Sequence, residues 1–227
     1  MNSRLEAVIV CVDYSDCLDF CIRYNRNNFD NIVIVTSPKD IATQDLVRAF
    51  GINPVITNAF YEDGAIFNKG KAINEGYKHL QYHDWVLNLD ADIILPNNLR
   101  KNFFNSHPNV NHFFWMKRMD LSDPKDIETV LLQRNYKKLK VMADDGGLGY
   151  FQLFNTKSIH FQNTLAATNL RPYPEDSKDA SQSDIQFRDK WPLRHIKEIA
   201  NTGCLHLGES MKNWQGRITP PVRLPKN

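Results

Sequence analysis

Short apolar runs alternate with amphipathic segments along residues 7–95. The apolar runs have the length and β-branched content of buried strands, and the segments between them carry apolar residues at helical spacing. We therefore predict strands at 7–13, 31–37, 54–60 and 85–95, and helices at 17–29, 40–51 and 69–81. Strands that alternate with helices form crossover units, and near-continuous apolar strands fit a sheet that is covered on both faces. The pattern predicts an α/β domain with a mainly parallel sheet.

The pattern becomes less regular after Pro96. Strands are predicted at 112–121 and 149–155, whereas 170–184 has the composition of a polar loop and 218–227 that of an irregular tail. The chain of 227 residues has no internal repeat and suits a single domain.

Composition and charge are those of an ordinary globular protein. Hydrophobic residues make up 42% and charged residues 24% of the chain, and the formal net charge is +2, so overall charge does not require a nucleic-acid or membrane partner. A basic run at 131–142 contains Arg134, Lys137, Lys138 and Lys140 without an acid. A solvated helix face is the simplest explanation of such a run, and contact with phosphates is the alternative.

The cysteines and the apolar segments bear on the cellular compartment. Cys11, Cys17, Cys21 and Cys204 form no C-x-x-C pair, so no disulfide or zinc framework is indicated. No stretch approaches the roughly 20 apolar residues of a transmembrane helix, and the N-terminal run lacks the layout of a signal peptide. We expect a cytoplasmic protein without a membrane anchor.

Two carboxylates interrupt the most apolar predicted strand. Asp90 and Asp92 lie inside V-L-N-L-D-A-D-I-I-L-P, residues 86–96, and residues two apart in a strand point to one face. Burying two like charges together is costly unless they share a cation. Open α/β sheets bind ligands at the carboxyl edge of their strands, and Mg2+ or Mn2+ prefers carboxylate oxygens together with phosphates. We interpret the pair as a metal-diphosphate clamp; the alternative is a turn cap beside a solvated aspartate.

The segment N-K-G-K-A-I-N, residues 68–74, precedes this strand. Lys69 and Lys71 are cations able to meet a diphosphate, and Gly70 allows a close backbone approach. A surface helix with two ordinary lysines is the alternative.

Residues 67–96, F-N-K-G-K-A-I-N-E-G-Y-K-H-L-Q-Y-H-D-W-V-L-N-L-D-A-D-I-I-L-P, resemble the segment that leads to the D-x-D motif of GT-A glycosyltransferases, especially family-2-like enzymes. The resemblance implies a GT-A, Rossmann-like fold with a central mixed, mostly parallel sheet flanked by helices. It implies a nucleotide-sugar-binding half at 1–96 and an acceptor-binding half at 97–227 with a C-terminal lid. It also implies a nucleotide-sugar donor, usually a UDP-sugar, and a Mn2+ or Mg2+ ion.

The same resemblance assigns residues to the donor and the metal. Asp90 would lie near the ribose and the metal, Asp92 would ligate the metal, and His206 would complete the metal site as the late histidine of such enzymes, although a lone histidine between apolar residues also fits a core position. The implied nucleotide-sugar contacts are Asp13, Tyr14, Thr36, Lys69, Lys71, Asn74, Asp90, Ala91, Gly147, Trp214 and Arg217. Asp13, Tyr14 and Thr36 close the first two strands, where turn formation explains them nearly as well.

Two flexible-looking segments also match the resembled enzymes. Gly146, Gly147 and Gly149 permit positive φ, and a similar glycine pair lines the donor-sugar and acceptor site; a plain turn is the alternative. N-W-Q-G-R, residues 213–217, resembles the C-terminal segment that closes over the donor. There Trp214 would cover the sugar, and Arg217 would neutralise diphosphate.

The segment S-Q-S-D-I-Q-F, residues 181–187, contains the candidate catalytic base. The resembled enzymes place an acidic element at the start of a helix that faces the anomeric carbon, and only Asp184 matches it, because Ser183 stands where glutamate is common. Ser183 and Gln186 also form a capping-box pattern. A helix N-terminus keeps an aspartate ionised, as a base must be.

Together these features predict a metal-dependent, inverting glycosyltransferase that moves a sugar from a nucleotide-sugar, expected to be a UDP-sugar, to a hydroxyl acceptor. The acceptor would be a glycan, a protein or a hydroxymethylated DNA base; in the last case the basic run and Arg188, Lys190, Arg194 and Lys197 would contact phosphates. One alternative is a sugar-phosphate nucleotidylyltransferase of the same fold, but its glycine-rich first loop is missing from V-D-Y-S-D-C-L-D-F, residues 12–20. The other is a non-catalytic nucleotide-sugar-binding protein.

Overall fold

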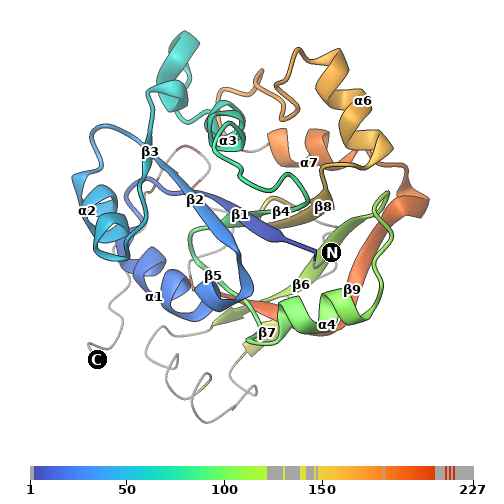
Figure 1. Cartoon of the computed structure of the whole chain (residues 1–227). Coiled ribbons are helices and arrows are strands. Elements are labelled where there is room, and N and C mark those ends of the chain that lie inside the picture. Colours follow the sequence, from blue (N-terminus) through green and yellow to red (C-terminus); the bar gives the residue numbers. More distant parts are fainter. Residues whose placement is uncertain are drawn as a thin grey trace.

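A mixed β-sheet forms the centre of the molecule, with helices packed on both of its faces (Figure 1). The computed structural model describes residues 3–121, 130, 139–141, 146, 148–180, 182–207, 213, 215 and 217. Within these residues the strand order is β3-β2-β1-β4-β8-β6-β9-β5, and β7 pairs with β6. The predicted α/β class with a central mixed sheet is confirmed.

The N-terminal strands are parallel, as the alternation of strands and helices predicts. β1 (Leu5–Val10) lies between β2 (Asn31–Thr36) and β4 (Trp85–Asp90), and β3 (Val55–Ile56) pairs with β2. The connecting helices are α1 (Ser15–Asn25), η1 (Arg26–Asn28), α2 (Ile41–Ala49), η2 (Ala59–Gly64) and α3 (Lys69–Tyr77). Parallel strands end at one edge of the sheet, so the polar residues that follow β1, β2 and β4 gather there.

The C-terminal strands extend the sheet beyond β4. β8 (Phe151–Asn155) is antiparallel to β4, β6 (Phe113–Leu121) is antiparallel to β8, and β9 (Ile196–His206) is parallel to β6. The remaining elements are β5 (Ile93–Ile94), β7 (Leu139–Val141), α4 (Leu99–Asn105), α6 (Ile159–Ala167), α7 (Ser183–Arg188) and η5 (Leu193–His195). No helix in the described part of the chain is long and apolar enough to cross a lipid bilayer.

Two strands differ from their predicted extents. The predicted strand 85–95 divides into β4 and β5 at a turn over residues 91–92, because β5 leaves the neighbours of β4 and pairs with the end of β9. The predicted strand 54–60 keeps only β3, because Thr57 Oγ1 accepts the backbone N–H of Ala59 (3.1 Å) and starts a turn. Helices α4 and α6 lie outside the predicted elements.

Aromatic side chains fill the core on the two faces of the sheet. On the face covered by α4, the ring of Trp85 lies 4.9 Å from the ring of Phe103 between centroids. On the other face, Phe154 lies 4.9 Å from Phe161 of α6 and 5.3 Å from Phe187 of α7. Burying one such ring stabilises the fold by roughly 1.5–3 kcal/mol. This packing fixes α7, the helix that carries Asp184.

The carboxylate of Glu6 is fully buried and holds the turn before β4. It accepts hydrogen bonds from the backbone N–H groups of Gln81 (2.7 Å), Tyr82 (2.9 Å) and His83 (3.0 Å), and from Nδ2 of Asn31 (2.9 Å). Hydrogen bonds to a buried charge are strong, and replacing the acceptor leaves several donors without a partner.

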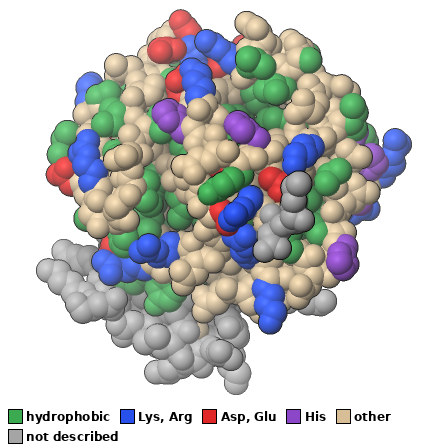
Figure 2. Space-filling model, viewed as in Figure 1, with side chains coloured by type: hydrophobic (Ala, Val, Ile, Leu, Met, Phe, Trp, Pro, Cys, Tyr) green, Lys and Arg blue, Asp and Glu red, His purple; other side chains and the backbone are tan. Residues whose placement is uncertain are grey.

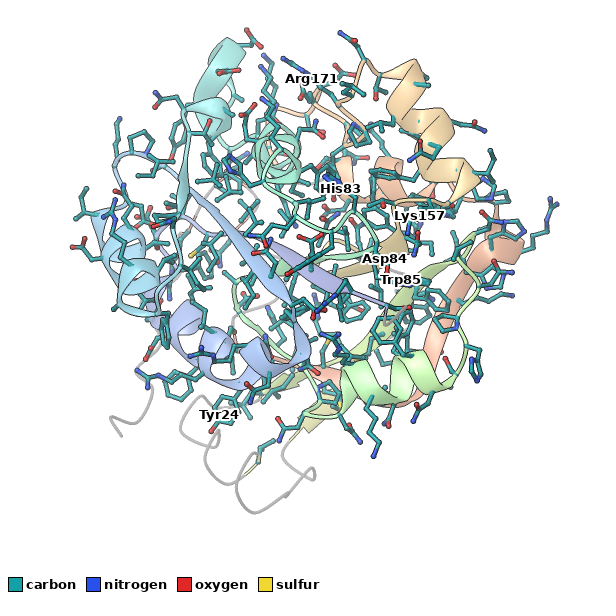
Figure 3. The ribbon with its side chains drawn as sticks, in the orientation of Figure 1. Tyr24, His83, Asp84, Trp85, Lys157 and Arg171 are labelled. Carbon is teal, nitrogen blue, oxygen red and sulfur yellow. The ribbon has the colours of Figure 1, made fainter. Side chains whose placement is uncertain are left out.

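We expect Glu6→Gln to lower the free energy of unfolding by about 2–4 kcal/mol, because the amide NH2 would face backbone donors. The affected turn lies at His83 and Asp84 on the near side of Figure 3. Urea unfolding at neutral pH measures the change. Glu75→Gln is the control, because Glu75 pairs with Lys78 on the surface of α3. This change should lower the free energy of unfolding by no more than about 0.5 kcal/mol. Equal stability of the two variants would contradict this role of Glu6.

Three histidines meet where α6, η5 and the start of β6 come together. Nε2 of His160 lies 2.8 Å from Nδ1 of His195, and the ring centroid of His112 lies 5.4 Å from that of His195. Partial burial and then the neighbouring His195 lower the pKa of His112 and His160, and Lys197 and Arg194 act in the same direction. The folded protein therefore favours the neutral forms of His112 and His160.

Because the folded pKa of His160 lies below the ordinary value of 6.5, its contribution to stability is present above that pH and is lost as the pH falls. We expect the free energy of unfolding to decrease from about pH 7.5 to about pH 5.5, across the ordinary histidine pKa. His160→Gln should make this decrease smaller, and the exposed His79→Gln should not. An identical pH dependence of both variants and the wild type would show that the cluster does not act in this way.

Candidate active site

Asp90 and Asp92 lie at the carboxyl edge of the sheet, where β4 ends. Oδ2 of Asp92 is 3.3 Å from Nε2 of His206, the last residue of β9. Nδ1 of His206 is 3.1 Å from Oδ1 of Asp120 in β6. The pairing of β5 with β9, which sets Ile93 opposite His206, produces this proximity. The structure thus brings together two of the three residues predicted to bind the metal.

This group of side chains is arranged around a positive charge. Burial would lower the pKa of His206, but Asp92 and Asp120 outweigh burial and raise it to about 9. Burial would raise the pKa of Asp92, but His206 outweighs burial and lowers it below the ordinary value. At neutral pH an imidazolium therefore lies between two carboxylates.

Lys69, the first residue of α3, connects Asp90 to Asp184. Its Nζ lies 2.8 Å from Oδ1 of Asp90 and 3.4 Å from Oδ2 of Asp184, and it donates to the carbonyl of Gly149 at 3.4 Å. Burial would lower the pKa of Lys69, but the two carboxylates outweigh it and raise the pKa. Burial raises the pKa of Asp90 although Lys69 opposes this. The two predicted functional carboxylates therefore share one ammonium group.

Asp184 lies in the first turn of α7 and is held from several sides. The hydroxyl of Tyr173 donates to its Oδ1, and Nε2 of Gln152 donates to its backbone carbonyl at 3.0 Å. The expected capping box is wrong: α7 begins at Ser183, so Ser183 is inside the helix, and its buried Oγ has no hydrogen-bond partner among the described residues. Tyr173 and Lys69, and not a cap, orient the carboxylate.

Because Gly149 has no side chain, the carboxylate of Asp184 can lie against it. A Cβ atom at Gly149 would overlap the carboxylate of Asp184. Gly149→Ala should therefore displace that carboxylate and lower turnover by about 100-fold, the cost of a misplacement of roughly 1 Å. It should also cost about 1–3 kcal/mol of stability, as overpacking does.

A double variant tests whether the overlap with Asp184 causes the effect of Gly149→Ala. In an Asp184→Ala background, Gly149→Ala should cost little stability in thermal unfolding, because the overlapping group is absent. A full stability loss in that background would place the conflict elsewhere.

Arg217 lies against the loop that follows β1. Its guanidinium donates to both carboxylate oxygens of Asp16 and to the carbonyl of Asp13 (2.8 Å), and its Cζ is 4.5 Å from the ring centroid of Tyr14. Asp13 has a φ of 62° and donates its N–H to Oδ2 of Asp40 at 2.7 Å. A residue from the C-terminal segment thus reaches the edge where the resemblance places the nucleotide.

Two predicted donor contacts are engaged elsewhere in the protein. Lys71 pairs with Glu62 (3.0 Å) and Asp63 at the surface. Asn74 is buried, and its side-chain amide exchanges hydrogen bonds with the backbone of Tyr173 (2.9 and 3.0 Å). The structure therefore gives Asn74 the role of holding the loop that carries Tyr173.

The same loop explains Gly70, because a Cβ atom there would overlap the carbonyl of Pro174. The close approach predicted at Gly70 thus occurs within the chain. Thr36 is buried, and its hydroxyl lies 3.4 Å from Oδ2 of Asp40, the cap of α2. Ala91 is buried in the turn between the two acids of the motif.

Several predicted residues lie outside the described part of the chain, so their roles stay predictions. They are Gly147, Trp214, Arg134, Lys137 and Lys138 and, as to its side chain, Lys140.

Three residues of this site were not found from the sequence: Tyr173, Gln152 and Asp120. Tyr173 lies between two prolines in a segment interpreted as a polar loop, where a buried aromatic is unusual. Asp120 stands near the end of a strand, as Asp90 does, but Lys117 and Arg118 precede it there, so it does not stand out as an acid in an apolar run. Gln152 carries no such signal, because its role depends on the pairing of β8 with β4.

The donor set suits a hard divalent cation, with two carboxylates and one imidazole. Within the described residues, no group of three His, Cys, Asp or Glu side chains is arranged so that it could hold a metal ion. One atom nevertheless fits a cation: the buried Oδ1 of Asp92 has no hydrogen-bond partner in the described structure. The third predicted ligand, Asp90, pairs with Lys69 through Oδ1.

Comparison with protein-family models and with curated protein sequences finds no match. Solved structures do match. The mannosyltransferase PcManGT from Pyrobaculum calidifontis, in complex with GDP-Man and Mn2+, is similar with a TM-score of 0.58 at 15% identity. The match covers 93% of this chain but only 59% of that chain, so this chain spans about three fifths of its length.

A protein from Bacillus anthracis assigned as a glucose-1-phosphate thymidylyltransferase, in complex with a sucrose, is similar with a TM-score of 0.51 at 11% identity, over 88% of each chain. Similarity at such low identity concerns the fold and not the activity. The sheet order and these similarities show that the chain has a GT-A fold, as the segment 67–96 predicts.

Proposed function

We propose that this protein is a metal-dependent glycosyltransferase that moves a sugar from a nucleotide-sugar to a hydroxyl group, with inversion at the anomeric carbon. The observation that carries the proposal is the position of Asp184, whose carboxylate shares the ammonium group of Lys69 with Asp90. A candidate base and the first acid of the D-x-D motif thus contact one cation at the carboxyl edge of the sheet.

The donor would lie along that edge. The loop after β1 and the end of β2 would take the nucleoside, and Arg217 would move from Asp16 to the diphosphate, since a guanidinium binds phosphate oxygens in a fork. A UDP-sugar is our first expectation for the donor. The similar mannosyltransferase was solved with GDP-Man, so GDP-sugars belong in the same test.

Asp90, Asp92 and His206 would hold Mn2+ or Mg2+. Such an ion supplies positive charge that stabilises the departing nucleoside diphosphate. In its absence, the proton on His206 and the ammonium of Lys69 balance the acids of the site. Imidazole favours Mn2+ over Mg2+.

Asp184 would act as the general base. The acceptor oxygen forms a bond to the anomeric carbon, and the bond from that carbon to the diphosphate breaks with its electron pair on the diphosphate. The acceptor proton passes to Asp184, for which Tyr173 and Lys69 fix the position of the carboxylate. Attack from the side opposite the leaving group inverts the configuration.

The acceptor is a glycan, a protein or a hydroxymethylated DNA base in this proposal. Binding along DNA requires a row of cations that follows the phosphates. On the face shown in Figure 2, the described lysines and arginines are dispersed among apolar and neutral groups. That face offers DNA no such row among its described residues.

The similar thymidylyltransferase fold makes nucleotidyl transfer the second candidate. Such an enzyme would consume a sugar phosphate and a nucleoside triphosphate and release pyrophosphate. The loop of residues 12–20 has no glycine with which to wrap a triphosphate. Pyrophosphate release from a triphosphate, without diphosphate release from a nucleotide-sugar, would favour this candidate.

The anomeric configuration of the product tests the proposal. Proton NMR follows the sugar of an α-linked UDP-sugar. In the first experiment water is the acceptor, and in the second the acceptor is a neutral glycan or hydroxymethylpyrimidine DNA. The β-anomer as the first product is the expected result. The α-anomer as the first product would contradict Asp184 as the base of an in-line displacement.

A further inference from the structure

A cavity lies between α4 and β9, apart from the acids of the candidate active site. Figure 1 shows α4 beside β6 and β9. The cavity has a volume of about 340 Å3. Its polar wall consists of Asn98, Asn102, Ser106, Glu198 and Thr202, and its apolar wall includes Leu99, Phe103, Phe114, Ile199 and Ala200. Its volume falls in the range of small-molecule sites, which begins at roughly 300 Å3.

An irregularity in the sheet creates this cavity. Trp115 of β6 pairs with Glu198, but Lys117 pairs with Gly203, so β9 carries extra residues between these two positions. The extra residues include Ile199, Ala200 and Thr202, which line the cavity. Bulges of this kind redirect side chains and often stand next to functional sites.

The wall of the cavity selects for a neutral, hydroxylated ligand. Among the described residues, no lysine, arginine or histidine lines the cavity, so the only nearby counter-charge for a phosphate or carboxylate is Lys117, which already pairs with Glu198. Glu198 provides a carboxylate that is 30% exposed and lies 3.4 Å from Nζ of Lys117. Amide, hydroxyl and carboxylate groups beside aromatic and aliphatic side chains are the groups that bind sugar hydroxyls and the apolar face of a sugar ring.

The cavity and the candidate metal residues share strand β9. His206 lies four positions after Thr202 on β9, which corresponds to about 13 Å of extended chain. A ligand in the cavity is therefore too far away to be the reacting group. The lining Phe103 packs against Trp85, the first residue of β4, and Asp90 is the last residue of that strand, so a glycan that reaches both places must span the length of β4.

We infer that this cavity is a second saccharide site, which binds a neutral sugar unit of an acceptor glycan away from the unit that reacts. The inference rests on the proposed function as regards the role of that glycan. Saccharide binding itself needs no donor, metal or turnover, so it is measured separately.

The test uses the complete chain, and neutral glucose, mannose and galactose trisaccharides are the probes. Two-dimensional amide NMR follows the side-chain NH2 signals while each trisaccharide is added. We expect a neutral trisaccharide to shift the NH2 signals of Asn102. A glucuronate-containing trisaccharide should bind more weakly because of Glu198.

Matched variants of α4 locate the site. Asn102→Ala should weaken trisaccharide binding by about tenfold, the loss of one to two hydrogen bonds. Asn105→Ala, which changes an exposed residue of the same helix outside the cavity wall, should leave the affinity unchanged. Ala200→Trp should fill the cavity and prevent binding while the polar groups remain.

Two results would overturn the inference: no binding of any neutral trisaccharide to the wild type, or equal binding to the wild type, Asn102→Ala and Ala200→Trp. Donor cleavage with water as the acceptor is measured in parallel. Trisaccharide binding without donor cleavage would refute the proposed transferase activity but support the second saccharide site. Donor cleavage without trisaccharide binding would support the transferase activity but refute the second site.

Discussion

Asp184→Asn should lower the rate of sugar transfer by about 10²- to 10⁴-fold, the usual contribution of a general base. Asparagine preserves the shape of the side chain and still accepts the hydrogen bond from Tyr173, but it does not take up the proton of the acceptor. The affinity for the nucleotide-sugar should change little, because the donor site is otherwise intact. Initial rates and calorimetric titration of the donor measure the two effects separately.

The control for Asp184 lies at the other end of the same helix. Asp189→Asn changes a carboxylate that ends α7, is 55% exposed and pairs with Arg188 at 2.8 Å. It should keep nearly the full transfer rate. A normal rate in Asp184→Asn, or an equal loss in both variants, would remove Asp184 from the mechanism.

Under the proposed function, Asp92→Asn should remove the metal dependence of sugar transfer. The change deletes a negative charge beside His206 and leaves Asp120 as the carboxylate that still contacts this third predicted ligand. We expect metal-dependent nucleotide binding to weaken by more than about 100-fold, which is the upper range for residues that only support a metal ligand. Titration of Mn2+ and UDP into the protein, alone and together, measures this loss.

Asp120→Asn distinguishes a residue that binds the metal from one that only orients a metal ligand. Asp120 contacts the other nitrogen of His206 at 3.1 Å, so it would orient the ring without holding the ion. Its replacement should weaken metal-dependent binding by about 10–100-fold, less than the replacement of Asp92. The reverse order, or a wild-type response to Mn2+ in Asp92→Asn, would contradict the assigned metal site.

The N-terminal half of the fold was predictable because its signals are local. The apolar runs at 7–13 and 31–37 and the helical spacing at 40–51 correspond to β1, β2 and α2. The C-terminal half was harder because its strands are defined by distant partners. β5 pairs with β9, far along the chain, so periodicity alone joined it to β4.

The residues of the candidate site also divide into those with a local sequence signal and those whose role depends on distant contacts. Asp90 and Asp92 stood out because acids in an apolar strand need a reason, and Asp184 stood out through a resemblance. Tyr173 gave no such signal, since its role comes from the contact of its loop with α3 through Asn74. Lys71 has the charge expected of a phosphate ligand, but sequence does not reveal that Glu62 and Asp63 surround it.

Release of nucleoside diphosphate from a panel of UDP- and GDP-sugars, in Mn2+ and then in EDTA, tests the central claim most directly. The account predicts that at least one donor is cleaved in Mn2+, that EDTA stops the cleavage, and that added Mn2+ restores it. Failure to cleave any donor, together with nucleotide binding that is indifferent to metal, would contradict the account.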